Sequence, residues 1–196
     1  MKIIAAKSEG RGRVLFVLLE ATGMRIGGAW GLEIDEHISP DFSALYIRQR
    51  VWRGRVQPFL KTHNGVRDVD FHSSIAAMLK IFVGSRNSGF LFCSKTGRPL
   101  LQWNVLRAYL YSLLERAGQQ KASAHAFQRF RTTWLRKQHA PEDLIRFWLG
   151  HANRSITDTY CKLNGDVVFR KNVAEQVGIG FELPTENLEV APIAPK

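Results

Sequence analysis

Apolar residues recur every three or four positions near the start of the chain, which predicts a helix over Arg13–Ala21 that ends before Gly23. A short second helix or a turn is expected at Gly27–Ile34. The period then changes, because residues 44–52 alternate between an apolar face and a polar one, which is typical of a strand. The second face is aromatic and basic and comprises Tyr46, Arg48, Arg50 and Trp52.

Two further strands are expected after this one. A turn at Arg53-Gly54-Arg55 leads into a second strand at Val56–Leu60. Asn64-Gly65 is a residue pair preferred in tight hairpin turns, and the third strand covers Arg67–Phe71. Together these segments predict a small three-stranded antiparallel sheet.

The helical period returns from Ser73 onward. Helices are expected at Ser74–Val83, Trp103–Ala117, Ser123–Lys137, Pro141–Leu149, Ser155–Leu163 and Asp166–Val177. The predicted fold class is therefore α+β, mostly helical, with a small sheet. One domain is expected over residues 1–181, followed by a flexible, proline-containing tail at 182–196.

The charge of the chain indicates a polyanionic partner. Its 196 residues carry a formal net charge of +11, and Glu182–Lys196 contributes −2, which leaves +13 on the remaining body. This excess favours nucleic acid, although solvated basic side chains or an acidic protein partner would also fit. The apolar runs are far shorter than the roughly 18 to 20 residues of a membrane span. Cys93 and Cys161 are interpreted as reduced thiols, so a cytoplasmic protein is expected, associated with the nucleoid when bound to DNA.

Three short segments and one lysine stand out as candidate chemistry. The segments are Thr22-Gly23-Met24-Arg25-Ile26-Gly27, His125-Ala126-Phe127-Gln128-Arg129, and Leu149-Gly150-His151 with Tyr160 nine residues after the histidine. Together with Lys61, which precedes the Asn-Gly turn, they resemble the tyrosine recombinases, the phage-integrase family. The family pattern is Thr-Gly-x-Arg, a hairpin Lys, His-x-x-Arg at a helix start, Leu-Gly-His and a Tyr. The match covers roughly residues 13–163 and carries the family order at Arg25, Lys61, His125, His151 and Tyr160.

The resemblance implies a catalytic-domain helical bundle that cleaves and rejoins DNA strands through a 3′-phosphotyrosyl intermediate, with no metal or other cofactor. Tyr160 would be the nucleophile, Arg25 and His151 would stabilise the phosphate, and Lys61 and His125 would move protons. A covalent phosphotyrosyl bond conserves the energy of the broken bond, so the strands can be rejoined without ATP. Double-stranded DNA is the expected partner, with further contacts from Arg48, Arg50, Arg53, Arg55, Arg129 and Arg154.

Elementary phosphate chemistry agrees with these roles. Cleavage needs a nucleophile in line with the leaving oxygen, and cationic donors for the charge that gathers on the non-bridging oxygens. His125 follows Ser123, the expected N-cap, and so lies in a first helical turn, where anions are attracted. The capping-box-like Ser155-x-x-Asp158 would place Tyr160 within a helix.

Position 128 departs from the family pattern. Gln128 stands where the family has its second catalytic arginine, and a neutral amide there should cost on the order of 10²–10³ in rate. Arg129 is a candidate substitute, since at i+4 it lies about 40° from the direction of His125 on an ideal helix. Gly28 also differs, because many members carry an acidic residue that braces the site at its position.

The resemblance bears on organisation as well. The chain begins almost at the first catalytic helix, so the N-terminal core-binding domain with which the family clamps DNA is expected to be absent. In the family, an element such as Asp166–Val177 often docks on a neighbouring protomer, which implies a homo-oligomer, a tetramer on DNA. A helix folded onto its own body would count against this hypothesis.

Alternatives stay open at this stage. Residues 141–163 also have the pattern of two helices joined by a turn, as in a helix-turn-helix DNA-binding protein. A catalytically silent DNA-binding module, such as an integrase relic, would share the basic surface, and residue 128 separates it best from an enzyme. A type IB topoisomerase shares the chemistry, but the short spacing from Leu-Gly-His to the tyrosine is recombinase-like. The histidines and cysteines form no close pairs with metal-ligand spacing.

Overall fold

The computed structural model describes residues 10–58, 65–100, 105–152 and 165–183. The first half of the chain contains helices α2 (Gly10–Thr22), α3 (Ile26–Trp30) and α4 (Ile34–His37), then strands β1 (Ala44–Ile47), β2 (Arg50–Trp52), β3 (Arg55–Gln57) and β4 (Arg67–Asp70). The second half contains α5 (Ser73–Val83), the π-helical η2 (Leu106–Tyr111), α7 (Ser112–Arg116), α8 (His125–Lys137), α9 (Glu142–Leu149) and α11 (Val167–Val177). The helices predicted from periodicity are therefore present wherever the structure describes the chain, and Ser155–Leu163 lies outside that part.

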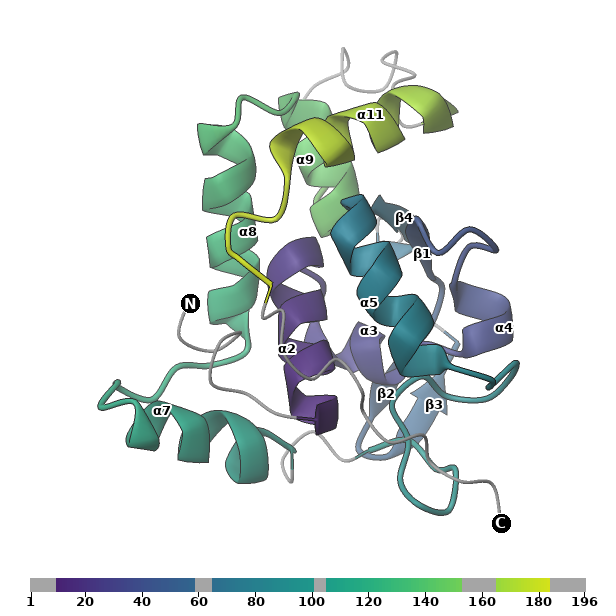
Figure 1. The fold of residues 1–196 in the computed structure, drawn as a ribbon, viewed down its shortest axis with the longest axis vertical. Helices are drawn as coiled ribbons and strands as arrows, with labels where there is room; N and C mark the ends of the chain where they lie inside the picture. Colours follow the sequence, from purple (N-terminus) through teal and green to yellow (C-terminus); the bar gives the residue numbers. More distant parts are fainter. Residues whose placement is uncertain (1–9, 59–64, 101–104, 153–164, 184–196) are drawn as a thin grey trace.

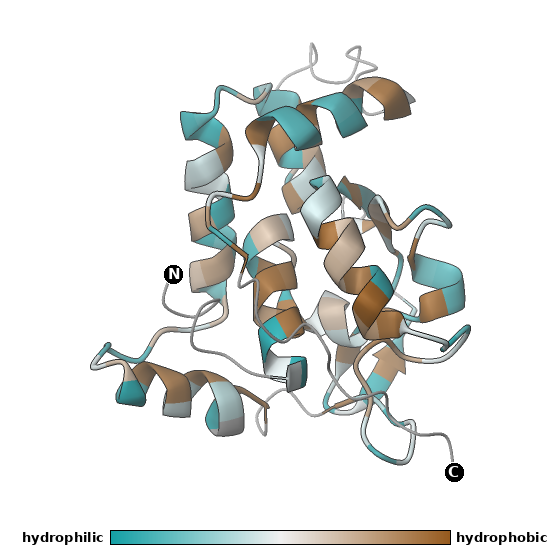
Figure 2. Cartoon of the chain, in the orientation of Figure 1, coloured by the Kyte–Doolittle hydropathy of each residue, from teal (hydrophilic) through white to brown (hydrophobic). Residues whose placement is uncertain are grey.

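Helix α2 forms the centre of the core. It lies between α8 and α5 (Figure 1), and every residue from Val14 to Leu19 is buried. Figure 2 shows that this helix is largely hydrophobic, whereas α8 carries hydrophilic and hydrophobic positions in turn. A helix that is apolar all round must be covered on all sides. The segments that carry Arg25 and His151 follow α2 and α9, and both helices contribute residues to the buried core.

The strands confirm the predicted α+β class but pair differently from the expected three-stranded sheet. In the described residues they form two antiparallel ladders, β1 with β4 and β2 with β3. The chain leaves the first ladder at Gln49, whose Nε2 donates to the carbonyl of Gly31 (2.9 Å) and to Oε1 of Glu33 (2.7 Å). These long-range bonds divide residues 44–52 into two strands. The residues predicted to face the core, Leu45, Ile47 and Val51, are buried as expected, although Ala44 on the opposite face is buried as well.

Helix α11 packs on the chain's own body, above α9 in Figure 1. Its residues Val173, Ala174 and Val177 are buried, and Arg170 forms an ion pair with Asp70 of β4 (3.0 Å). This arrangement counts against the hypothesis that the helix docks on a neighbouring protomer. Residues 184–196 of the predicted tail lie outside the described residues. No described helix is both long and apolar enough to cross a membrane.

Glu20 is a carboxyl group in the interior of α2. Its side chain is 0% exposed, and neither oxygen has a hydrogen-bond partner among the described residues. Burial raises its pKa to about 8, because the charged form is poorly solvated in the core. Glu20 is therefore mainly protonated at neutral pH in the folded protein.

Replacing Glu20 by Gln is expected to stabilise the protein increasingly as the pH rises. The folded pKa of about 8 exceeds the unfolded value of 4.5, so the contribution of Glu20 to stability is fully present below pH 4.5 and is lost as the pH rises through 8. Glutamine does not ionise, and its advantage in free energy of unfolding should grow by about 2–3 kcal/mol between pH 5 and pH 7. Urea unfolding at both pH values measures this difference, and an unchanged difference would contradict the burial of a neutral Glu20.

Candidate active site

The turn between α2 and α3 positions Arg25. Gly23 ends α2 with a φ of +65°, and a Cβ at this position would lie 2.7 Å from Cδ2 of Leu149. Only glycine suits both the dihedral angle and the contact with α9. Met24 and Ile26 are buried on either side, whereas Arg25 is exposed. The backbone is thus anchored in the core while the guanidinium projects outward, without a hydrogen bond or ion pair to the described residues.

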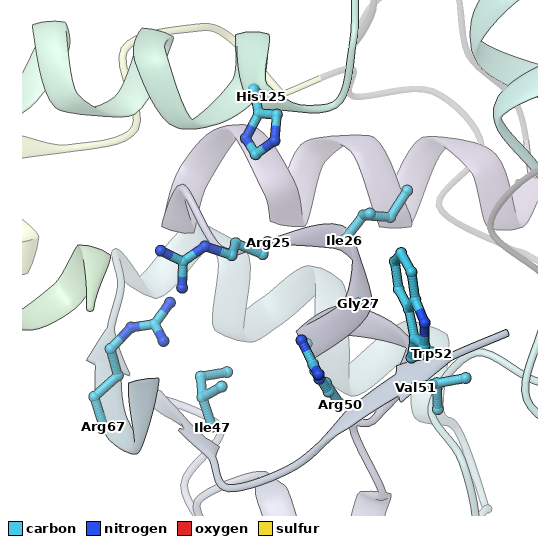
Figure 3. A pocket seen from close by; sticks show the side chains of 10 residues that line it. Arg25, Ile26, Gly27, Ile47, Arg50, Val51, Trp52, Arg67 and His125 are labelled. Carbon is cyan, nitrogen blue, oxygen red and sulfur yellow. The ribbon is translucent and has the colours of Figure 1, made fainter. Parts of the chain in front are cut away.

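A cavity of about 190 Å³ opens beside Arg25 (Figure 3). Its lining comprises Arg25, Ile26, Gly27, Gly28, Ile47, Arg50, Val51, Trp52, Arg67 and His125. Three of these side chains are arginines, and no carboxylate belongs to the lining that the described residues provide. The cavity is smaller than the roughly 300–1,000 Å³ of small-molecule pockets. It therefore suits a protruding anionic group such as a phosphate better than an entire small molecule.

His125 reaches this cavity from the first turn of α8, as predicted. The predicted N-cap Ser123 is wrong, because Ala124 occupies the cap position and makes no side-chain capping bond. Ala124 already has helical dihedral angles (φ −56°, ψ −20°), so Ser123 lies one residue before the cap position. The side chain of His125 is exposed, so it is accessible to a ligand in the cavity.

Gln128 lies almost one turn beyond His125 on α8 and is half-buried. Its Nε2 is buried and has no hydrogen-bond partner among the described residues. An amide group of this kind is a neutral donor that still lacks an acceptor. Arg129 is exposed and does not line the cavity, and Arg131 is directed elsewhere, donating from Nη1 to the carbonyl of Gly178 (2.7 Å). Helix α8 thus brings a histidine, but no guanidinium, to the cavity.

His151 follows α9 in a loop, as predicted. Gly150 ends the helix in the left-handed conformation (φ 68°, ψ 40°), and the amide of His151 donates to the carbonyl of Arg146 (2.9 Å). Desolvation lowers the pKa of His151 below its usual value, and the positive charges of Arg25 and Arg67 lower it further. The imidazole is therefore neutral at pH 7 and close enough to both arginines to sense their charge.

Arg67 is a candidate site residue that the motif analysis missed. It begins β4, is 4% exposed, and donates from Nε to the carbonyl of Trp148 (2.7 Å) and from Nη1 to that of Gly65 (2.7 Å). Burial and then the charge of Arg25 lower its pKa to about 10, which leaves it cationic at neutral pH. The signal in the sequence was its position, because alternation places it on the same face of the strand as buried Val69.

The arginines predicted to contact DNA have different surroundings. Arg50 lines the cavity and donates to Oε1 of Gln57 from Nε (3.0 Å) and Nη2 (2.8 Å). Arg48 forms an ion pair with Asp68 (2.6 Å), which holds its side chain along the β1–β4 ladder. Arg53, Arg55 and Arg129 are exposed, as is Arg48. The β2–β3 hairpin therefore offers cations both to the cavity and to the surface around it.

Lys61, Arg154 and Tyr160 lie outside the described residues, so their roles stay predictions. Within the described part of the chain, no group of three or more His, Cys, Asp or Glu side chains could hold a metal ion. The described part of the site therefore consists of cationic and neutral donors: Arg25, Arg50, Arg67, His125 and His151.

Curated proteins with similar sequences are tyrosine recombinases. A tyrosine recombinase XerC-like protein of Caldanaerobacter subterraneus subsp. tengcongensis is 27% identical over 185 residues, covering 80% of this chain and 46% of that protein. Tyrosine recombinase XerD of Corynebacterium glutamicum is 29% identical over 168 residues, covering 83% of this chain and 52% of that protein. The chain spans about half the length of these relatives.

Solved structures have the same fold at low sequence identity. The Tn1549 transposon integrase in complex with a circular intermediate DNA has a TM-score of 0.63 and 14% identity, over 83% of this chain and 61% of that chain. Its complex with transposon right-end DNA has a TM-score of 0.60 and 18% identity, over 89% and 61%. The sequence profile of the Phage integrase family matches residues 1–166. The chain therefore belongs to the Phage integrase family, and its fold is that of a tyrosine-recombinase catalytic domain.

Proposed function

We propose that this chain cleaves and rejoins double-stranded DNA through a 3′-phosphotyrosyl intermediate formed on Tyr160. The observation that supports this most directly is the cavity in which Arg25, Arg67 and His125 converge, with no carboxylate among the lining residues that the structure describes. Such a site favours a group that gains negative charge during the reaction. Family membership supports strand cleavage as the reaction class, in place of the simple docking of a helix-turn-helix protein.

The reaction consists of two reciprocal transfers of one phosphoryl group. The Oη of Tyr160 attacks the scissile phosphorus as its proton passes to His125, and a P–Oη bond forms while the P–O5′ bond breaks. Lys61 protonates the departing 5′ oxygen. Rejoining reverses these steps, because a 5′ hydroxyl attacks the phosphotyrosine and restores the phosphodiester bond without an external energy source.

Arg25 and His151 stabilise the charge on the non-bridging oxygens. The guanidinium of Arg25 has no competing partner among the described residues and can turn both of its donor edges to a phosphate. A neutral His151 donates one N–H without requiring protonation, which fits the lowered pKa. Gln128 offers its unpartnered Nε2 where the family has a cation, so cleavage proceeds slowly.

Basic side chains around the cavity provide further contacts to the DNA backbone. Arg50 lies in the lining, Arg48, Arg53, Arg55 and Arg129 are further described members of this set, and Arg154 is included from its sequence position alone. Binding through these phosphate contacts weakens steeply as salt is added. We also propose a homo-oligomer on DNA, a tetramer. Assembly through α11 would first require its contacts to Asp70 and the neighbouring core to break.

A nicked suicide duplex tests the proposed function, with a bound sequence first selected from a random duplex pool. The unchanged protein is expected to form a slow covalent protein–DNA band, and Tyr160→Phe to form none. Tyr109→Phe is the matched control, because Tyr109 is exposed on η2 and its variant removes the same hydroxyl away from the site. A band that persists in Tyr160→Phe would refute the proposed nucleophile.

A catalytically silent DNA-binding module is the second candidate function. The neutral Gln128 at an arginine position favours it. This alternative would be supported if neither the unchanged protein nor Gln128→Arg formed a band on a duplex that both bind. Equal binding by the two proteins is measured on the same duplex without a nick.

A further inference from the structure

We propose that Arg67 binds the scissile phosphate as the second guanidinium of the site, on the face opposite His125. This inference rests on the proposed function, since the phosphate is the one that Tyr160 attacks. It gives the scissile phosphate two arginine ligands, Arg25 and Arg67, although position 128 supplies none. Figure 3 shows their guanidinium groups pointing toward each other across the cavity.

The hydrogen bonds of Arg67 leave one donor group for a ligand. Nε and Nη1 are held by two backbone carbonyls, those of Trp148 and Gly65, whereas Nη2 is buried and has no partner among the described residues. A buried donor without a partner is costly, so such groups call for an explanation. Two bonds that fix the guanidinium plane, in a side chain that lines the cavity, are the arrangement of a preorganised anion ligand.

The charges around Arg67 also indicate an anion. Arg25 and Arg67 face each other, and the described residues of the lining include no carboxylate that would offset their repulsion. Two like charges at the rim of a low-dielectric interior repel more strongly than they would in water. A phosphate between them would replace this repulsion by two charge-assisted interactions. Arg48, in contrast, forms an ion pair with Asp68, so the charge of this arginine on the same ladder is already offset.

The place of Arg67 in the fold accounts for the missing arginine of α8. The guanidinium of Arg131 is committed to Gly178, and Arg129 does not line the cavity. Arg67 instead enters from β4, a strand tied to α9 through Trp148. The loop that carries His151 follows α9 directly, so the contact between β4 and α9 positions both Arg67 and His151.

Inorganic phosphate tests the anion site without requiring catalysis. The melting temperature is measured at pH 7 while phosphate replaces chloride at constant ionic strength, and phosphate is expected to raise it in the unchanged protein. Arg67→Gln and Arg25→Gln should lose this rise, whereas Arg98→Gln should keep it. Arg98 is the matched control, since it is exposed in another loop and its variant removes the same charge. Arg67→Lys, which keeps the charge, is the second variant if Arg67→Gln folds poorly.

Cleavage provides the second readout. Arg67→Gln is expected to slow covalent attachment to the nicked duplex by roughly 10- to 100-fold, the value of one hydrogen bond to a charged group. On a duplex with a neutral methylphosphonate at the scissile position the loss should be smaller, because less charge gathers on that group. If Arg67 only held β4 against α9, Arg67→Gln would slow covalent attachment to both duplexes equally.

The two readouts separate the inference from the proposed function. No phosphate effect in the unchanged protein, a phosphate effect that survives in Arg67→Gln, or an equal loss on both duplexes would overturn the role of Arg67. A third outcome is that no covalent band forms, while phosphate stabilises the unchanged protein and Arg98→Gln but not Arg67→Gln. This outcome would refute cleavage and support the anion site. Loss in both readouts supports both proposals.

Discussion

Replacing Gln128 by Arg is expected to raise the rate of covalent attachment by about 10²–10³-fold, the cost of one missing oxyanion donor. The position lies on α8 almost one turn from His125, and its Nε2 is buried without a partner in the described structure. A guanidinium there would replace a neutral donor by a cation that can make two parallel bonds to a phosphate. DNA binding without a nick should change little, since the gain arises mainly in the transition state.

Single-turnover kinetics on the nicked duplex measure this gain. Gln138→Arg is the matched control, because Gln138 is an exposed residue at the C-terminal cap of the same helix and its variant adds the same charge. A similar acceleration in both variants would show that the added positive charge acts only by attracting DNA. If Arg67 already supplies the second guanidinium, the gain from Gln128→Arg should be larger in the Arg67→Gln background than in the natural one.

Local patterns predicted most of the helices and the backbone around Arg25. The apolar period predicted α2, and the glycine that ends it was readable as a helix terminator because its positive φ serves that purpose. The loop position of His151 followed in the same way from Gly150. These features depend on residues close together in the sequence, so a local sequence pattern is enough to predict them.

Long-range contacts decided what the patterns could not predict. The break between β1 and β2 comes from Gln49 bonding to Gly31 and Glu33, and no local rule marks a glutamine as a strand terminator. The role of Arg67 depends on carbonyls of distant residues that satisfy two of its nitrogens. An arginine at the start of a strand is ordinarily exposed, so only the packed structure distinguishes this one.

The docked position of α11 also follows from a contact across the chain. Arg170 is 4% exposed, its Nε lies 3.0 Å from Oδ2 of Asp70, and its guanidinium lies 5.2 Å from the ring centroid of Phe147. Asp70 is 1% exposed and accepts a hydrogen bond from Nε1 of Trp148 (2.9 Å). Asp70 therefore links the C-terminal helix to the helix that precedes His151.

Replacing Arg170 by Met is expected to lower the free energy of unfolding by about 3–5 kcal/mol, because it leaves the buried carboxylate of Asp70 without its cation. The double variant Arg170→Met, Asp70→Asn should recover much of this loss, since it leaves no charge unpaired while Asn can still accept from Trp148. Urea unfolding at pH 7 measures both, with Lys171→Met as the control for a lysine on the same helix whose partner, Asp41, is exposed.

The pH dependence distinguishes a lost ion pair from lost packing. Burial already raises the pKa of Asp70 above its usual value, and removal of Arg170 should raise it further. A group with a raised folded pKa contributes most stability below its unfolded pKa and loses that contribution as the pH rises. The deficit of Arg170→Met should therefore shrink as the pH falls from 7 toward 4. A deficit that is constant over this range, with no recovery in the double variant, would instead assign the loss to the packing of Arg170 on Phe147.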